Sequence, residues 1–249
     1  MESTTIQPIF DRDGYIALPV FILPQRMNEI RREVERFLNT QLEYLPEDHV
    51  VREDPANPAS IRQVRELQRY DEFFNDLARD DHLKLAAETV LKGPAGPIHV
   101  QYFNKPPGAN TATPPHQDAI YFDTNAAETV ELWLALDDAD EDTGCMYYVR
   151  GSHVLGLLPH QPTGVTGFEQ GLVDDAICKD PRTLVPCSAR AGDLLVHSAL
   201  IVHWSGKNES SHRQRRALSF IFQRGVTADT DDESSVREPD IASGAPGAA

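Results

Sequence analysis

Two histidines and an aspartate are the residue types in this chain best suited to hold a metal ion together. His116 and Asp118 stand two positions apart in the segment "PHQDAIYF". If this segment is a strand, both side chains project from the same face, so an imidazole and a carboxylate lie side by side. Non-haem iron(II) oxygenases bind iron through two histidines and one carboxylate and leave positions open for a co-substrate and dioxygen. The pair therefore indicates two of the three ligands of such a site.

The third ligand has two candidates further along the chain. His197 and His203 both lie in the strand-like stretch "GDLLVHSALIVHWSGKN", and the residue pattern alone allows either of them. The basic residues Arg213, Arg215 and Arg216 follow. An arginine here would suit 2-oxoglutarate, because a guanidinium binds a carboxylate through a planar fork and stays protonated. Taken alone, the same cluster is also typical of a solvated surface.

Composition narrows the classes of partner. The chain has 249 residues and a formal net charge of −16, which argues against a general nucleic-acid or anionic-membrane surface. Its three cysteines form no C-x-x-C pair, so neither a disulfide framework nor a cysteine zinc site is indicated. The first residues carry no export signal, and no run of 18 apolar residues occurs. We expect a cytoplasmic protein that has no nucleic-acid or membrane partner, and its oligomeric state is not readable.

The elements that must position these residues change in character along the chain. Residues of about 20–92 predict a mainly helical part, with one helix starting at Pro24 and a second helical stretch starting near the N-cap candidate Ser60. The polar, proline-punctuated segment 44–59 between them predicts a loop. From about residue 97 to residue 225, short runs rich in β-branched and aromatic residues alternate with turn residues, which is typical of an antiparallel sandwich or barrel.

This order of helices followed by strands predicts a mainly β fold with flanking α-helices, specifically a double-stranded β-helix, the cupin-like jelly roll. We expect a single domain over residues 1–225. The glycine-rich segment 154–175 predicts a long loop that could act as a lid. The segment 226–249 has no aromatic residue, which predicts a flexible acidic and Gly/Ala-rich tail.

Several ordered motifs in the chain resemble one family. The motifs "NKPPG", "HQD", "LWLALDDADEDTGCM", "RGSH", "GD…H…HWSGKN" and "RRA" are similar to those of the phytanoyl-CoA dioxygenase family, over roughly Asp13 to Gln223. The resemblance implies that His116, Asp118 and His203 bind iron, and it is the resemblance that favours His203 over His197.

The resemblance also implies an anchor for the co-substrate. It points to Arg215 as the 2-oxoglutarate arginine, with Arg216 or Arg213 as alternatives because the spacing is one residue longer than expected. Further co-substrate contacts are implied for Gln101, Asn104, Trp133 and Ser205, although Trp133 could equally be a core aromatic. Where the family usually has P-G-S-H, this chain has R-G-S-H, with Arg150 in place of the proline. We expect substrate contacts from Arg150, His160 and Phe168.

The implied activity is that of a dioxygenase that uses Fe(II), 2-oxoglutarate and O2 and releases succinate and CO2. Because Asp118 is present, hydroxylation of an aliphatic carbon is the default, and the acidic chain favours a small-molecule substrate over a CoA nucleotide. The same chemistry could instead serve desaturation, epimerisation or ring formation. The alternative of another class is a non-catalytic metal-binding β-sandwich module.

Overall fold

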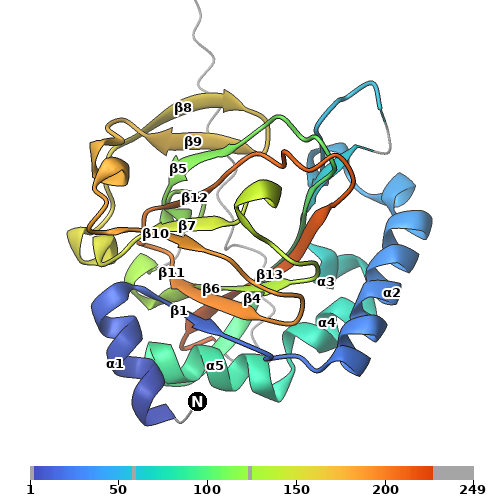
Figure 1. The fold of residues 1–249 in the computed structure, drawn as a ribbon. Coiled ribbons are helices and arrows are strands. Elements are labelled where there is room, and N and C mark those ends of the chain that lie inside the picture. Colours follow the sequence, from blue (N-terminus) through green and yellow to red (C-terminus); the bar gives the residue numbers. More distant parts are fainter. Residues whose placement is uncertain (1–2, 58–59, 123–124, 227–249) are drawn as a thin grey trace, which may run out of the picture.

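The computed structural model describes residues 3–57, 60–122 and 125–226, so the predicted tail lies, apart from Val226, outside the described residues. Two antiparallel sheets form the body of the molecule (Figure 1). In sheet order, the larger sheet contains β1 (Tyr15–Leu18), β11 (Leu194–Ser198), β6 (Thr129–Ala135), β13 (Arg215–Arg224), β4 (Ala95–Lys105), β3 (Ile61–Val64) and β2 (Val50–Arg52). The smaller sheet contains β10 (Leu184–Cys187), β7 (Met146–Val149), β12 (His203–Ser205) and β5 (Thr113–His116). This arrangement is the predicted jelly roll, so the predicted fold class is confirmed.

Successive side chains along β6 in the larger sheet pack into two different apolar clusters, one on each face of the sheet. In β6, Leu132 and Leu134 belong to the apolar cluster shared with the helices, whereas Trp133 and Ala135 belong to a second cluster shared with Tyr148 of the smaller sheet. Successive residues of a strand point to opposite faces. One face of the larger sheet is therefore covered by helices, and the other faces the smaller sheet.

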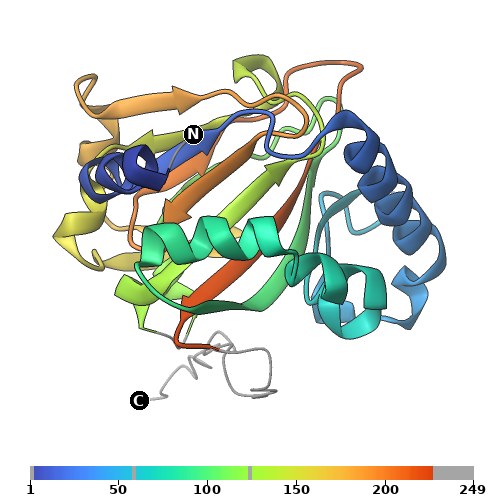
Figure 2. The same ribbon diagram turned by 90° about the horizontal axis from the view of Figure 1, so that it is seen from below.

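The helices lie against the outer face of the larger sheet (Figure 2). They are α1 (Ser3–Asp13), α2 (Pro24–Thr40), α3 (Leu67–Tyr70), α4 (Glu72–Ala78) and α5 (Asp81–Leu91). The predicted start of α2 at Pro24 is confirmed, and its apolar stripe of Met27, Ile30, Val34 and Phe37 is buried. None of the described helices is both long and apolar enough to cross a bilayer. Short 3-10 turns complete the described elements: Leu42–Tyr44, Glu47–His49, Asp118–Ile120, Ala126–Glu128, Glu141–Thr143, Ser152–Leu155 and Ala176–Lys179.

The predicted helix from Ser60 is wrong at its start, and the predicted loop over 44–59 is wrong in its middle, where Val50–Arg52 form β2. Residues Ile61–Val64 form β3, which pairs with both β2 and β4. All four residues of β3 are buried, so the period-two alternation that marks a half-buried strand is missing. The Ser60 hydroxyl donates to the carbonyls of Asp54 and Asn57 and closes the turn between β2 and β3, instead of capping a helix.

The predicted loop over 154–175 is also wrong, because most of this segment is a β-hairpin. Strands β8 (His160–Val165) and β9 (Phe168–Leu172) pair with each other and form a third, two-stranded sheet. Gly164 and Gly167 have φ values of 71° and 84°, which suit the left-handed backbone of the turn. Figure 1 shows the hairpin beside β5, the strand that ends in His116.

The stretch that contains both candidate histidines is broken into two strands. His197 lies on β11 in the larger sheet, whereas His203 starts β12 in the smaller sheet. The turn between them lies at Ala199–Val202, where the Ile201 amide donates to the carbonyl of Ser198. The two histidines therefore approach the interior of the sandwich from opposite sheets.

Candidate metal centre and its two cavities

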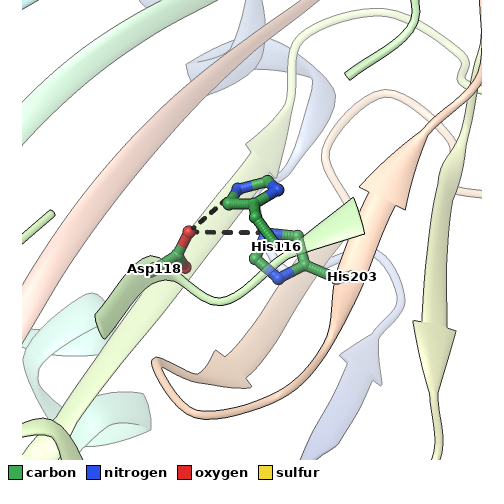
Figure 3. A group of neighbouring side chains, drawn as sticks. All are labelled: His116, Asp118 and His203. Carbon is green, nitrogen blue, oxygen red and sulfur yellow. Dashed lines mark ion pairs between the residues drawn. The ribbon is translucent and has the colours of Figure 1, made fainter. Parts of the chain in front are cut away.

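His116, Asp118 and His203 come together between the two sheets (Figure 3). His116 ends β5 and is the register partner of His203 on β12, so these two imidazoles lie side by side with ring centroids 4.3 Å apart. The Nε2 atoms of both histidines lie 3.4 Å from Oδ1 of Asp118. All three side chains are buried. The ligand-type atoms of the three residues all lie within 4.8 Å of one another, close enough to surround one ion.

Backbone carbonyls fix how the two imidazoles present their nitrogens. Nδ1 of His116 lies 2.8 Å from the carbonyl oxygen of Pro114, and Nδ1 of His203 lies 3.1 Å from that of Ile201. A ring nitrogen that donates to a carbonyl carries the proton, which leaves a lone pair on Nε2. Both lone pairs are therefore available on the side of Asp118. Two imidazole nitrogens and one carboxylate oxygen are the donor set that suits iron(II).

His197 lies behind Asp118, on the other sheet. Its Nε2 atom is 3.1 Å from Oδ2 of Asp118, and its Nδ1 atom is 3.1 Å from the hydroxyl of Tyr148. Asp118, Glu131 and His197 form a second group of three ligand-type side chains, with 3.8 Å between His197 Nε2 and the Glu131 carboxylate. His197 is not among the described residues that line either cavity beside the centre.

The electrostatics separate the two carboxylates. Burial works to raise the pKa of Asp118, but the charge of His203 and the hydrogen bonds of His116 and His197 outweigh it and hold that pKa well below its usual range. Burial and the nearby charge of Asp118 raise the pKa of Glu131 well above its usual range. Burial also lowers the pKa of His203 to about 3, so this imidazole carries its charge only in acid, where Asp118 titrates, and near neutral pH it is neutral and can act as a ligand. Asp118 is therefore the carboxylate of the centre that carries the charge.

A small cavity of about 50 Å³ on one side of the centre is rich in cations. Arg62, Lys105 and Arg215 all line it and are all buried. Burial, followed by the charges of Arg215 and Arg62, lowers the pKa of Lys105 well below its usual range. Nη2 of Arg62 is buried and has no hydrogen-bond partner among the described residues. An unpaired buried donor among three cationic groups fits an anionic ligand such as the far carboxylate of 2-oxoglutarate.

Of the three clustered arginines, Arg215 is the one that the described structure brings to this cavity. Its Nε and Nη2 atoms donate to the carbonyl of Gly144 at 3.0 and 2.7 Å, and its guanidinium lies 5.3 Å from the ring centre of Trp133. Arg213 instead pairs with Asp140, and Arg216 pairs with Asp137, both away from the cavity.

The other residues predicted for the co-substrate pocket divide between two cavities. Trp133, Ser205 and Asn104 line the small cavity. The Ser205 hydroxyl donates to that of Thr113 at 3.1 Å, and Asn104 donates to the Ile61 carbonyl at 3.1 Å. Gln101 instead lines a larger cavity of about 300 Å³, which also reaches His116 and Asp118.

The three residues expected to contact substrate are not brought together. Phe168 lines both cavities, and its ring centroid lies 5.5 Å from that of His116. His160 supports the centre from outside, because its Nε2 accepts the amide N–H of Gln117 at 3.1 Å. Arg150 is exposed and donates to the carbonyl of Arg182 at 2.9 Å, and neither cavity includes it among its described lining residues.

Several residues at the site were missed from the sequence. They are buried charged or polar residues that line one or both cavities: Arg62, Gln63, Glu66, His99, Lys105 and Glu131. In β4, the inward positions alternate with Val100 and Tyr102, which pack against the helices. Charged residues at alternate positions of otherwise apolar strands were the signal that could have found His99, Lys105 and Glu131.

Comparison with known proteins agrees with the geometry of this site. The family model described as phytanoyl-CoA dioxygenase (PhyH) matches residues 10–217. The chain belongs to the phytanoyl-CoA dioxygenase family. Among curated members, it is 24% identical to the peroxisomal phytanoyl-CoA dioxygenase of Mus musculus, over 86% of this chain and 66% of that protein. It is 31% identical to phytanoyl-CoA dioxygenase 1 of Oryza sativa subsp. japonica, over 66% of this chain and 58% of that protein. The chain thus spans just under two thirds of the length of these relatives.

The fold of this family member is shared with a solved structure. The epimerase SnoN, in complex with Fe3+, alpha ketoglutarate and nogalamycin RO, has a TM-score of 0.68 and 24% sequence identity, over 89% of this chain and 83% of that chain. At this level of identity the likeness concerns the fold.

Proposed function

We propose that this chain is an Fe(II)- and 2-oxoglutarate-dependent dioxygenase that hydroxylates an aliphatic carbon of a small metabolite and releases succinate and CO2. The observation that carries the proposal is the buried group of two Nε2 lone pairs and one carboxylate, at the rim of a cavity lined by three cations. Membership of the family and the iron and alpha ketoglutarate named for SnoN support it.

In this proposal the metal ligands are His116, Asp118 and His203. His197 holds the second oxygen of Asp118, so that Oδ1 stays directed at the two imidazoles. Tyr148 holds His197 in turn. Outer partners of this kind fix the orientation of ligands.

Arg215 anchors the far carboxylate of 2-oxoglutarate, with Arg62 and Lys105 adding positive charge. Burial lowers the pKa of Arg215 to about 10, so this guanidinium still carries its charge at neutral pH. Trp133 packs beside the guanidinium and, with Asn104 and Ser205, shapes the cavity. Gln101 contributes from the neighbouring cavity.

Bound iron and 2-oxoglutarate supply the oxidising power by activating dioxygen. The chain's own part is to hold, orient and shelter. Phe168 stacks on Phe103 and meets the ring of His116 edge to face, so that it covers the centre on the hairpin side. Tyr121 fixes the hairpin, because its hydroxyl donates to the carbonyl of Gln170 at 2.9 Å and accepts that residue's amide N–H at 3.1 Å. The hairpin is the part of the molecule placed to act as a lid.

The test is an anaerobic titration with Fe(II) and 2-oxoglutarate, followed by admission of oxygen. We expect a visible charge-transfer band before oxygen is added and succinate afterwards. Iron binding with neither the band nor any succinate would favour the non-catalytic metal-binding module instead.

Epimerisation is the second candidate, because SnoN is described as an epimerase. Product mass separates the outcomes. Hydroxylation adds one oxygen atom, desaturation or ring formation removes two hydrogen atoms, and epimerisation leaves the mass unchanged.

The proposal also includes a cytoplasmic location and action without nucleic acid or membrane. The net charge of −16 and the three free, buried cysteines support this.

A further inference from the structure

We propose that the larger cavity binds a neutral, multiply hydroxylated ring compound as the substrate to be oxidised, instead of an acyl thioester or a free acid. This inference rests on the proposed function, because the same His116 and Asp118 form one wall of the cavity. The cavity of about 300 Å³ lies at the small end of the range for ligand sites, which suits a compact molecule.

The walls of this cavity do not suit an acyl chain. Among the described residues that line it, none is aliphatic, and its apolar surface comes from Phe103, Phe122 and Phe168 together with the ring of Tyr121. A long acyl chain would need a continuous apolar wall to recover the free energy of leaving water. Separate aromatic faces can instead cover the apolar faces of a ring while its polar groups point elsewhere.

Both arginines that line the cavity are already paired with carboxylates. Nδ1 of His99 lies 2.8 Å from the Glu66 carboxylate, and Nε of Arg69 lies 3.1 Å from the same group. Arg65 lies 3.9 Å from Glu169 of the hairpin. Within the described lining, therefore, each arginine has a carboxylate partner, and a phosphate or carboxylate would have to break a pair to bind.

One residue that lines this cavity has an acceptor atom without a partner among the described residues. Gln63 is 4% exposed, and its Nε2 donates to Oε1 of Gln101, while its own Oε1 is buried and receives no hydrogen bond from the part of the chain that the structure describes. A buried acceptor that lacks a donor destabilises the protein until one is supplied. Hydroxyl groups donate to such an oxygen, whereas ionised carboxylates and phosphates cannot.

The backbone at Glu66 supports a functional role for this wall. Glu66 has φ 61° and ψ 35°, a left-handed conformation that non-glycine residues adopt at a cost. This conformation directs its carboxylate to the pair with His99 at the cavity, where Gln68 also donates to it at 2.7 Å. Gln63, Glu66 and His99 thus supply polar groups to this cavity beside its aromatic residues, with His99 6.2 Å from the ring centroid of Phe122.

The experiment uses the full chain with Fe(II) and 2-oxoglutarate, and it compares three sets of probes by the succinate they release. The sets are methyl glycosides of hexoses and 6-deoxyhexoses, medium-chain fatty acids, and palmitoyl-CoA. We expect stimulation by members of the glycoside set. Gln63→Leu should raise the KM for the best glycoside by about tenfold, the effect of one hydrogen bond to a buried group, and should leave the anaerobic charge-transfer band unchanged. Gln161→Leu is the matched control, because Gln161 is exposed on β8.

The charge-transfer band distinguishes failure of this inference from failure of the proposed function. If the band forms but only the acids or the thioester stimulate turnover, or no glycoside does, the inference is overturned and the proposed function stands. An unchanged KM in Gln63→Leu would also overturn it. If no band forms at all, the proposed function itself fails.

Discussion

The two cavities share a wall at the metal centre, yet they are built from opposite chemistry. The small cavity gathers Arg62, Lys105 and Arg215, and the carboxylate paired with Arg62 is Glu53 at 3.7 Å. The larger cavity has four carboxylates besides Asp118, and its two arginines are paired with two of them. The first cavity therefore needs an anion to complete it, whereas the second has no unpaired arginine to offer to an anion. In the proposed function, this difference is what lets one centre distinguish an acidic co-substrate from a neutral substrate.

Strand β4 runs from one cavity to the other. Its inward residues His99 and Gln101 line the larger cavity, Phe103 lines both, and Lys105 lines the small one. Because side chains alternate along a strand, four inward positions of one strand are enough to change the character of the wall. The boundary between the two chemistries falls at Phe103, which stacks with Phe168 of the hairpin at 6.1 Å between ring centroids.

Substitution of a predicted metal ligand should have the largest effect, because both cavities depend on the metal centre that they share. We expect Asp118→Ala and His203→Ala to lower succinate formation by more than the roughly 100-fold that loss of an outer partner can cost. His212→Ala is the matched control, since His212 is exposed. Normal turnover by the Asp118 variant would contradict the assignment of the centre.

A substitution in the small cavity should weaken the binding of 2-oxoglutarate without removing a metal ligand. Arg215→Ala removes a buried cation that faces the ligand, which typically costs 2–5 kcal/mol, so we expect the KM for 2-oxoglutarate to rise by about 100-fold. Arg213→Ala, which breaks a partly exposed pair with Asp140, should change it by less than about fivefold. Equal effects of the two substitutions would show that the anchor is misassigned.

The support behind Asp118 should have a smaller effect. His197→Asn removes the hydrogen bond to Oδ2 of Asp118, and we expect iron affinity to fall by about 10- to 100-fold. The Kd for Fe(II) under anaerobic conditions measures this, with the melting temperature recorded to detect unfolding. A merely structural role would lower the melting temperature and leave the Kd of the folded protein unchanged.

The smallest effect is expected in the larger cavity and depends on pH. Burial works to raise the pKa of Glu66, but its hydrogen bond with His99 and the charges of His99 and Arg69 outweigh it, so the pKa is lowered from its ordinary value of 4.5. A carboxylate with a lowered folded-state pKa stabilises the protein above its unfolded-state pKa, and this contribution is lost as the pH falls through the folded-state value.

Glu66→Gln should therefore lower the melting temperature by a few degrees near neutral pH, at about 2–4 °C for each kcal/mol. The difference from the unsubstituted protein should shrink as the pH falls below 4.5. Thermal melts across this range provide the measurement. A difference that stays constant with pH would mean that the Glu66 charge does not stabilise this wall.

Much of the site could be predicted from the sequence where local spacing carries the signal. The pair His116 and Asp118 is two residues apart, so one short segment already brings them together. The choice between His197 and His203 was different, because it depends on a turn that sends the two residues to opposite sheets. Spacing within a strand-like stretch contains no information about that turn, and family motifs supplied the choice.

The jelly roll could be predicted from its alternating strands, whereas β3 could not. All four residues of β3 are buried, so its sequence lacks the alternation that marks a half-buried strand. The apolar residues Ile61 and Val64, three positions apart, therefore fit a helix as well as a strand. That error also hid Arg62 and Gln63, since their facing positions appear only once the strand is placed beside β4. The hairpin was missed for another reason. Its glycines and prolines are typical of loops, and its two strands, β8 and β9, pair with each other.

The most direct test of the central claim is the position of iron in crystals grown anaerobically with Fe(II) and 2-oxoglutarate, located by anomalous scattering at the iron edge. We expect the iron peak between Nε2 of His116, Nε2 of His203 and Asp118, with the far carboxylate of 2-oxoglutarate at Arg215. A peak held by Asp118, Glu131 and His197, the second group of ligand-type side chains, or 2-oxoglutarate in the larger cavity, would contradict the account.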